Sequence, residues 1–141
     1  MRNGARQLAA FFVVLALPAL LLVSCERASK TPPPEDALRV MNNIKAAFNA
    51  EDTDAFTADF AAIMFTQGFT KDAYLDVIQQ LKRKYGHWET ETYLGEVTGE
   101  YAWRLKMEKG SLKLILVLNE EHKVIGLWFR RFALWEKLVG K

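Results

Sequence analysis

The stretch YAWRLKMEKGSLKLILVL (residues 101–118) decides the fold of this chain. In residues 101–108, aromatic and aliphatic residues alternate with small or charged ones, which predicts a strand with one apolar and one polar face. Lys109-Gly110 predicts a tight hairpin turn. Residues 112–118 are apolar on both faces around their middle, which is typical of a central strand.

Two further strands flank this hairpin. Residues 124–132 follow a polar turn and are again apolar on both faces, whereas residues 88–97 are rich in Glu and Thr and suit a sheet edge. The second half of the chain therefore predicts a four-stranded antiparallel meander.

The segment before the meander predicts three helices. The first follows Pro34, the second starts near Asp52 or Thr53, and the third runs from an N-cap at Thr70 to a C-cap at Gly86. Their expected inner faces, taken from the helical spacing of apolar residues, are Ala37, Met41, Ile44 and Phe48; Phe56, Phe60, Ile63 and Met64; and Tyr74, Val77, Ile78, Leu81 and Tyr85. We therefore expect an α+β fold with the helices on one face of the sheet.

The N-terminus predicts export and lipid attachment. Arg2 and Arg6 precede an apolar run over residues 8–23, and Leu22-Val23-Ser24-Cys25 has the pattern of a bacterial lipobox. A membrane-spanning anchor is the alternative, but the run is short and contains a proline. We expect a signal peptide in residues 1–24, a lipidated Cys25 with a proline-rich tether in residues 25–34, and one domain in residues 35–141.

Net charge argues against nucleic-acid binding. Without the two signal-peptide arginines, Lys and Arg fall from 19 to 17, which equals the 17 Asp and Glu. No convincing basic stripe of the kind that binds phosphate backbones is present. Lys82-Arg83-Lys84 suits the C-terminal end of the third helix, and a phosphate or lipid-headgroup patch is the alternative.

Three segments resemble a known family. FNAED (residues 48–52), Tyr85-Gly86 and KVIGLWFR (residues 123–130) resemble the small secreted domain of unknown function 3887, over roughly residues 37–131. That family is similar to the nuclear transport factor 2-like cone fold, so the resemblance implies a curved sheet that wraps helices around a pocket. Related domains precede class A β-lactamase-like serine hydrolases, which also implies a role beside an envelope hydrolase.

The residues offer no catalytic signature. Phosphate-binding glycine loops, HExxH and CxxC pairs and nucleophile elbows are missing from the sequence, and His87 and His122 lie in separate loops. We therefore expect neither a metal nor a cofactor, and we assign no catalytic residue. The hypothetical pocket residues are Phe60, Met64, Trp103, Trp128 and Asp59.

Two opposed interpretations of this pocket stay open. In one, Trp103 and Trp128 line a concave face that binds a small apolar ligand. In the other, phenylalanines around Asp59 raise its pKa so that it acts as the general base of a small isomerase or hydratase, with Tyr93 or Tyr101 as hydrogen-bond donor.

The leading hypothesis is a non-catalytic, lipid-anchored protein of the bacterial cell envelope, facing the periplasm or the exterior. Its domain would bind an apolar ligand or an envelope protein, and a homodimer is a further possibility. The apolar C-terminal segment FALWEKL (residues 132–138) would dock over the sheet, over an open end of the pocket or on a second copy.

Overall fold

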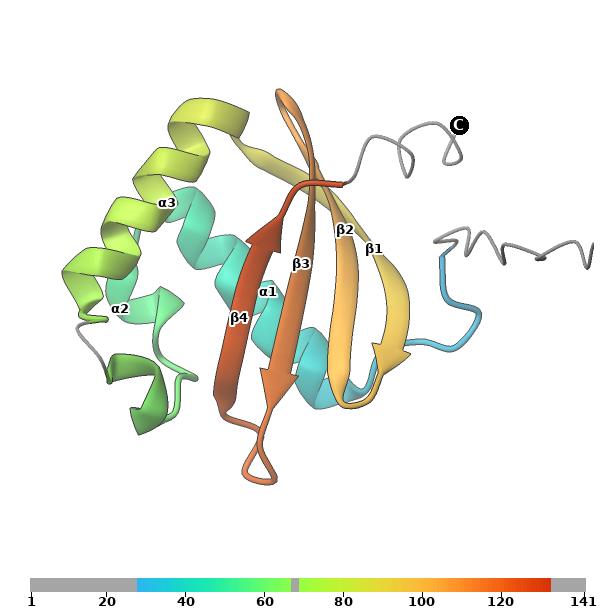
Figure 1. Ribbon diagram of the computed structural model, residues 1–141. Coiled ribbons are helices and arrows are strands. Elements are labelled where there is room, and N and C mark those ends of the chain that lie inside the picture. Colours follow the sequence, from blue (N-terminus) through green and yellow to red (C-terminus); the bar gives the residue numbers. More distant parts are fainter. Residues whose placement is uncertain (1–27, 67–68, 133–141) are drawn as a thin grey trace, which may run out of the picture.

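The computed structural model describes residues 28–66 and 69–132 (Figure 1). The signal peptide, the lipobox and residues 133–138 of the apolar C-terminal segment lie outside these residues. No helix in the described ranges is long and apolar enough to cross a bilayer. In chain order, the elements are α1 (Glu35–Ala50), α2 (Thr53–Phe56), the short 3-10 helix η1 (Ala62–Phe65), α3 (Lys71–Tyr85), β1 (Trp88–Val97), β2 (Glu100–Met107), β3 (Gly110–Leu118) and β4 (Val124–Arg130).

The four strands form one antiparallel sheet in the order β1-β2-β3-β4, which confirms the predicted meander. Leu114 of β3 lies opposite both Trp103 of β2 and Phe129 of β4. Because directly opposed residues share a face of the sheet, these three side chains define its inner face, on the side of α1.

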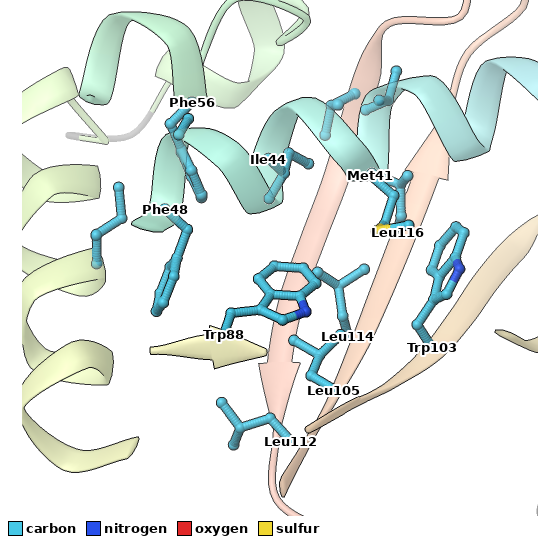
Figure 2. Packing of buried hydrophobic residues seen from close by; sticks show 14 of the residues in the cluster. Met41, Ile44, Phe48, Phe56, Trp88, Trp103, Leu105, Leu112, Leu114 and Leu116 are labelled. Atoms are coloured by element: carbon cyan, nitrogen blue, oxygen red, sulfur yellow. The ribbon is translucent and has the colours of Figure 1, made fainter. Parts of the chain in front are cut away.

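The core lies between α1 and the inner face of the sheet (Figure 2). The α1 side chains Met41, Ile44 and Phe48 are buried there, as predicted. Phe48 meets the ring of Trp88 edge-on, with 6.0 Å between the ring centroids. The sheet contributes buried side chains from its three later strands and the start of the first, namely Trp88, Trp103, Leu105, Met107, Leu112, Leu114, Leu116 and Val124.

Helix α3 begins and ends where the sequence predicts. The Thr70 side chain accepts a hydrogen bond from the Ala73 N–H at 3.2 Å. Gly86 ends the helix with φ of 74°, a conformation that favours glycine. A β-carbon at this position would also lie 2.4 Å from the Glu108 carboxylate. Ile78 is buried as expected, whereas Val77 is exposed.

The predicted second helix is wrong beyond its first turn. Asp52 caps it as expected, by accepting a hydrogen bond from the Ala55 N–H at 3.0 Å. The helix ends at Phe56, however, and Phe60 forms an isolated parallel bridge with Val124 of β4. Backbone pairing with β4 therefore replaces the helix, and it leaves Ile63 exposed rather than on an inner face.

Part of the predicted tether lies against the sheet. The Ser29 N–H donates a hydrogen bond to the Tyr93 carbonyl of β1 at 2.9 Å. The segment before α1 thus meets the sheet at the edge opposite to β4 (Figure 1).

Candidate functional site

The two edges of the sheet differ in character. The β1 edge carries Glu and Thr side chains and receives the hydrogen bond from Ser29. The β4 edge, with the sequence VIGLWFR, is apolar until Arg130. Natural sheets protect exposed edges with charges, prolines, bulges or covering segments, so an apolar edge is typical of a site that meets a partner.

Only the start of β4 is covered by another segment among the described residues. The Val124 N–H donates to the Asp59 carbonyl at 2.8 Å, and the Ala61 N–H donates to the Val124 carbonyl at 2.9 Å. Beyond Val124, no backbone hydrogen bond reaches this edge within residues 28–66 and 69–132. Because alternate residues of a strand direct their N–H and C=O groups outward, the later part of β4 presents backbone donors and acceptors.

An apolar hollow of about 410 Å³ lies beside this free edge. Exposed apolar side chains are concentrated in it: Ile63 is 59% exposed, Phe69 52% and Trp128 43%. Its lining comes from η1, two residues between η1 and α3, the start of α3, and β4. The described lining residues are Ile63, Met64, Thr66, Phe69, Tyr74, Ile125, Gly126, Leu127 and Trp128. Such a concentration of exposed apolar surface is typical of a binding site.

Gly126 allows Trp128 to lie across the strand. A β-carbon at Gly126 would approach the six-membered ring of Trp128 to within 2.4 Å. A glycine inside a strand often marks a close approach of this kind. Gly126 was not among the predicted pocket residues, although a lone glycine within an apolar strand was the available signal.

A second hollow, of about 440 Å³, lies between the C-terminal half of α3 and strands β3 and β4. Three of its lining residues are cations: Arg83, Lys84 and Arg131. Within the described part of the chain, none of these three has a carboxylate oxygen within 4.0 Å. Both hollows are lined by α3 and β4, so the edge of β4 has an apolar end and a basic end.

Lys82, the remaining cation of the Lys82-Arg83-Lys84 triplet, has a structural role. Lys82 donates hydrogen bonds from Nζ to the Asn49 carbonyl at 2.9 Å and to the Glu51 carboxylate at 2.8 Å. These contacts place a cation at the C-terminal end of α1, where the helix dipole favours it.

Tyr74 joins η1 to α3. Its hydroxyl donates a hydrogen bond to the Met64 carbonyl, and its ring meets that of Phe60 edge-on at 5.1 Å between centroids. Burial raises the pKa of Tyr74 above its usual value of 10.0, so the hydroxyl stays protonated. Tyr74 therefore supports the wall of the apolar hollow.

The structure contradicts the expectation that Asp59 has a raised pKa. Its carboxylate accepts hydrogen bonds from Arg39 Nη1 and Asn43 Nδ2, both at 3.0 Å. Burial alone raises the pKa of Asp59, but these hydrogen bonds and the charges of Arg39 and Lys123 together lower it below 3.8. An ionised carboxylate held by an arginine is a poor general base at neutral pH.

The two tyrosines considered as hydrogen-bond donors are remote from Asp59. Tyr93 lies on β1 and Tyr101 on β2, whereas the Asp59 backbone joins β4. Burial, followed by the neighbouring Glu96 and Tyr101, raises the pKa of Tyr93, whose ring packs on that of Trp103 at 5.2 Å.

Asp59 makes a pH-dependent contribution to stability. Because its pKa is lowered in the folded state, its contribution is fully present above the usual value of 3.8 and is lost as the pH falls through the folded-state value. We expect Asp59→Asn to lower the free energy of unfolding by about 1 kcal/mol at neutral pH, since the partner Arg39 is half exposed. Urea unfolding of the wild type and of Asp59→Asn at decreasing pH measures the difference between their free energies of unfolding. This difference should disappear below pH 3.8. A difference that stays constant in acid would contradict the assignment.

The five predicted pocket residues separate into three groups. Met64 and Trp128 line the apolar hollow together. Phe60 and Trp103 are buried in the core, and Asp59 faces the polar side of α1. The expectation that Trp103 and Trp128 line one concave face together is wrong, because β3 separates their strands and Trp128 lies opposite Ile115 on the outer face.

No group of three or more His, Cys, Asp or Glu side chains suited to a metal ion occurs in the described ranges. His122 instead lies 3.5 Å from the Asp36 carboxylate at the surface.

The fold of this chain is similar to that of a solved protein structure, whereas no match exists at the level of sequence families. No protein-family model matches the chain, and no curated protein sequence matches it. The crystal structure of a SnoaL-like protein of unknown function from Burkholderia thailandensis matches 72% of this chain and 100% of its own, with a TM-score of 0.52 and 18% identity. Bd1075 from Bdellovibrio bacteriovorus covers 70% of this chain and 40% of its own, at 15% identity and a TM-score of 0.39, too low to support an argument. The chain therefore has a SnoaL-like fold, which is the nuclear transport factor 2-like α+β architecture that the family resemblance implies.

Proposed function

We propose that this chain is a lipid-anchored protein of the bacterial cell envelope whose domain binds a partner and catalyses no reaction. The observation that carries the proposal is the apolar hollow beside the free edge of β4, which Met64 and Trp128 both line. Its lining is apolar except for Thr66 and Tyr74, and the Tyr74 hydroxyl is already bonded to the Met64 carbonyl. Such a surface favours binding of apolar groups.

The alternative of a small isomerase or hydratase has less support. Its proposed base, Asp59, is paired with Arg39 and Asn43 and has a lowered pKa. Among the residues that the structure describes, none that line the apolar hollow has an acidic or basic side chain. Proton transfer needs a group with a pKa near the working pH within reach of the substrate, and neither place supplies one.

Photo-crosslinking in cells tests the binding site. A benzoylphenylalanine at position 128 should form a specific adduct, identified by mass spectrometry, because Trp128 lines the apolar hollow. Position 97 is the matched control, since Val97 is 75% exposed and lies at the far end of β1. An envelope hydrolase in the adduct would support an accessory role. Equal labelling at both positions, or none at 128, would contradict the proposed site.

The anchor is tested by chemical labelling. Cells fed an alkyne-tagged palmitate should label the wild-type protein, and Cys25→Ser should abolish the label because serine has no thiol. Ser24→Ala is the matched control, since alanine is also small and should keep the label. Persistent labelling of the Cys25→Ser variant would show that Cys25 is not the lipidated residue.

A further inference from the structure

Resting on the proposed function, we infer that the partner is an extended peptide segment that adds a strand to the free edge of β4, with an apolar side chain in the hollow beside Trp128 and an acidic group at the basic end. Strand addition uses backbone hydrogen bonds for affinity and pockets for alternate side chains for specificity. The edge of β4 offers both components, as its contacts show.

The backbone component comes from the later part of β4. Residues 59–61 pair with the strand only at Val124, after which the chain departs into η1. From Gly126 onward the edge has no backbone partner within the described residues. A peptide bound there would continue the line that residues 59–61 begin.

The side-chain component comes from the apolar hollow. Leu127 and Trp128 border it on the strand side, and Ile63 and Met64 face them from η1. Side chains of a bound strand alternate between its two faces, so every second residue of the peptide would meet this hollow. A β-branched or aromatic residue at that position would bury the most apolar surface.

The charge component distinguishes one end of the peptide from the other. Arg83, Lys84 and Arg131 surround the second hollow, which also contains the Phe129 side chain. Leu127 and Arg131 are four residues apart, which spans about 13 Å in an extended strand. An acidic side chain or a terminal carboxylate should therefore lie about four residues from the apolar anchor.

Two other occupants fit less well. Residues 131–132, the last that the structure describes, turn away from this edge, because the Phe132 ring lies against the Arg104 guanidinium of β2, with 5.1 Å from the guanidinium carbon to the ring centroid. A second copy that paired through the same edge of β4 would bring its own α3 and η1 toward the walls of the two hollows. Hollows of about 410 and 440 Å³ accommodate side chains of a single extended segment.

The experiment uses the full-length protein in detergent and a random nonapeptide library displayed on phage. Peptides that alternate β-branched or aromatic residues and carry an acidic group about four residues from an apolar one should be enriched. The tightest peptide is then synthesised with a fluorophore and with single N-methyl groups along its backbone, and binding is followed by fluorescence anisotropy. Methylation should weaken binding roughly tenfold at alternate residues and leave the intervening ones nearly unchanged.

Charge reversal tests the basic end. Arg131→Glu should weaken binding of the acidic peptide roughly tenfold. Lys30→Glu, the same charge change on the exposed part of the segment before α1, should leave it within twofold. Uniform sensitivity to methylation, equal effects of the two variants, or no enriched peptide would each overturn the inference. So would a peptide-independent dimer that buries position 128, or Arg131-dependent binding to anionic lipid vesicles without peptide binding. If the position-128 adduct still forms in those cases, the proposed binding function stands and only strand addition is wrong.

Discussion

Replacing Trp88 with alanine is expected to lower the free energy of unfolding by about 3–5 kcal/mol. Trp88 is only 1% exposed, and its ring meets those of Phe48 and Phe129 edge-on at 6.0 and 6.5 Å between centroids. Its indole N–H also donates a hydrogen bond to the Glu91 carboxylate at 3.2 Å. Removing the ring leaves a cavity at the centre of the core, where α1 meets the start of β1 (Figure 2).

Urea unfolding followed by far-ultraviolet circular dichroism measures this loss without relying on tryptophan fluorescence. Val97→Ala is the control, since Val97 is 75% exposed and should change the free energy by less than about 0.5 kcal/mol. Domains of this size have total stabilities of about 5–15 kcal/mol, so the Trp88 variant should be unfolded at far lower urea. A loss below about 1 kcal/mol would contradict the burial of this ring.

Asn49→Ala is expected to lower the free energy of unfolding by about 2–4 kcal/mol, because two backbone groups would lose their partner. The Asn49 side chain accepts a hydrogen bond from the Trp88 N–H and donates one to the Trp88 carbonyl, both at 3.0 Å. It thereby attaches the end of α1 to the first residue of β1. This contact gives a physical role to one residue of the FNAED segment.

Two variants separate the contributions of Asn49. Asn49→Asp keeps the acceptor for the Trp88 N–H but loses the donor for its carbonyl, so its effect should be intermediate. Asn43→Ala removes one exposed hydrogen bond, to Asp59, and should cost less than either. Thermal and urea unfolding rank the three variants, and an Asn43 effect equal to that of Asn49→Ala would contradict this account.

The elements that sequence patterns predict well are those stabilised by local rules. Thr70 and Gly86 delimit α3 as expected because a side-chain cap and a glycine C-cap with positive φ depend mainly on residues nearby in the sequence. Alternating residues likewise predict β2, although it begins at Glu100 and ends at Met107, one residue before the expected range. Strand ends shift easily, because one residue more or less in a turn leaves the alternation unchanged.

The errors arise where distant segments decide the outcome. Phe56 and Phe60 are spaced as on a helix, yet the bridge between Phe60 and Val124 joins residues far apart in the sequence. The pKa of Asp59 depends on Arg39 and Asn43, which precede it by 20 and 16 residues. No local pattern reports such contacts.

The apolar hollow was predictable in part. Met64 and Trp128 were expected to share a pocket, and both line the apolar hollow. Their surroundings were not predictable, because β4 is apolar on both faces and its residue order does not show which face meets α1. The irregularity between Val117 and Leu118 in its pairing with β3 shifts the register once more.

The hydrogen bond between Ser29 and Tyr93 fixes the edge of the sheet at which the N-terminal segment meets the domain. The chain enters the sheet along β1, and the free edge of β4 lies three strand spacings away, about 14 Å, on the other side of the sheet. In an anchored protein, attachment and binding would therefore occupy opposite sides of the domain. If the protein is anchored as proposed, lengthening the segment before residue 28 would change the distance between the bilayer and the domain, while Ser29 would still meet the domain at the β1 edge.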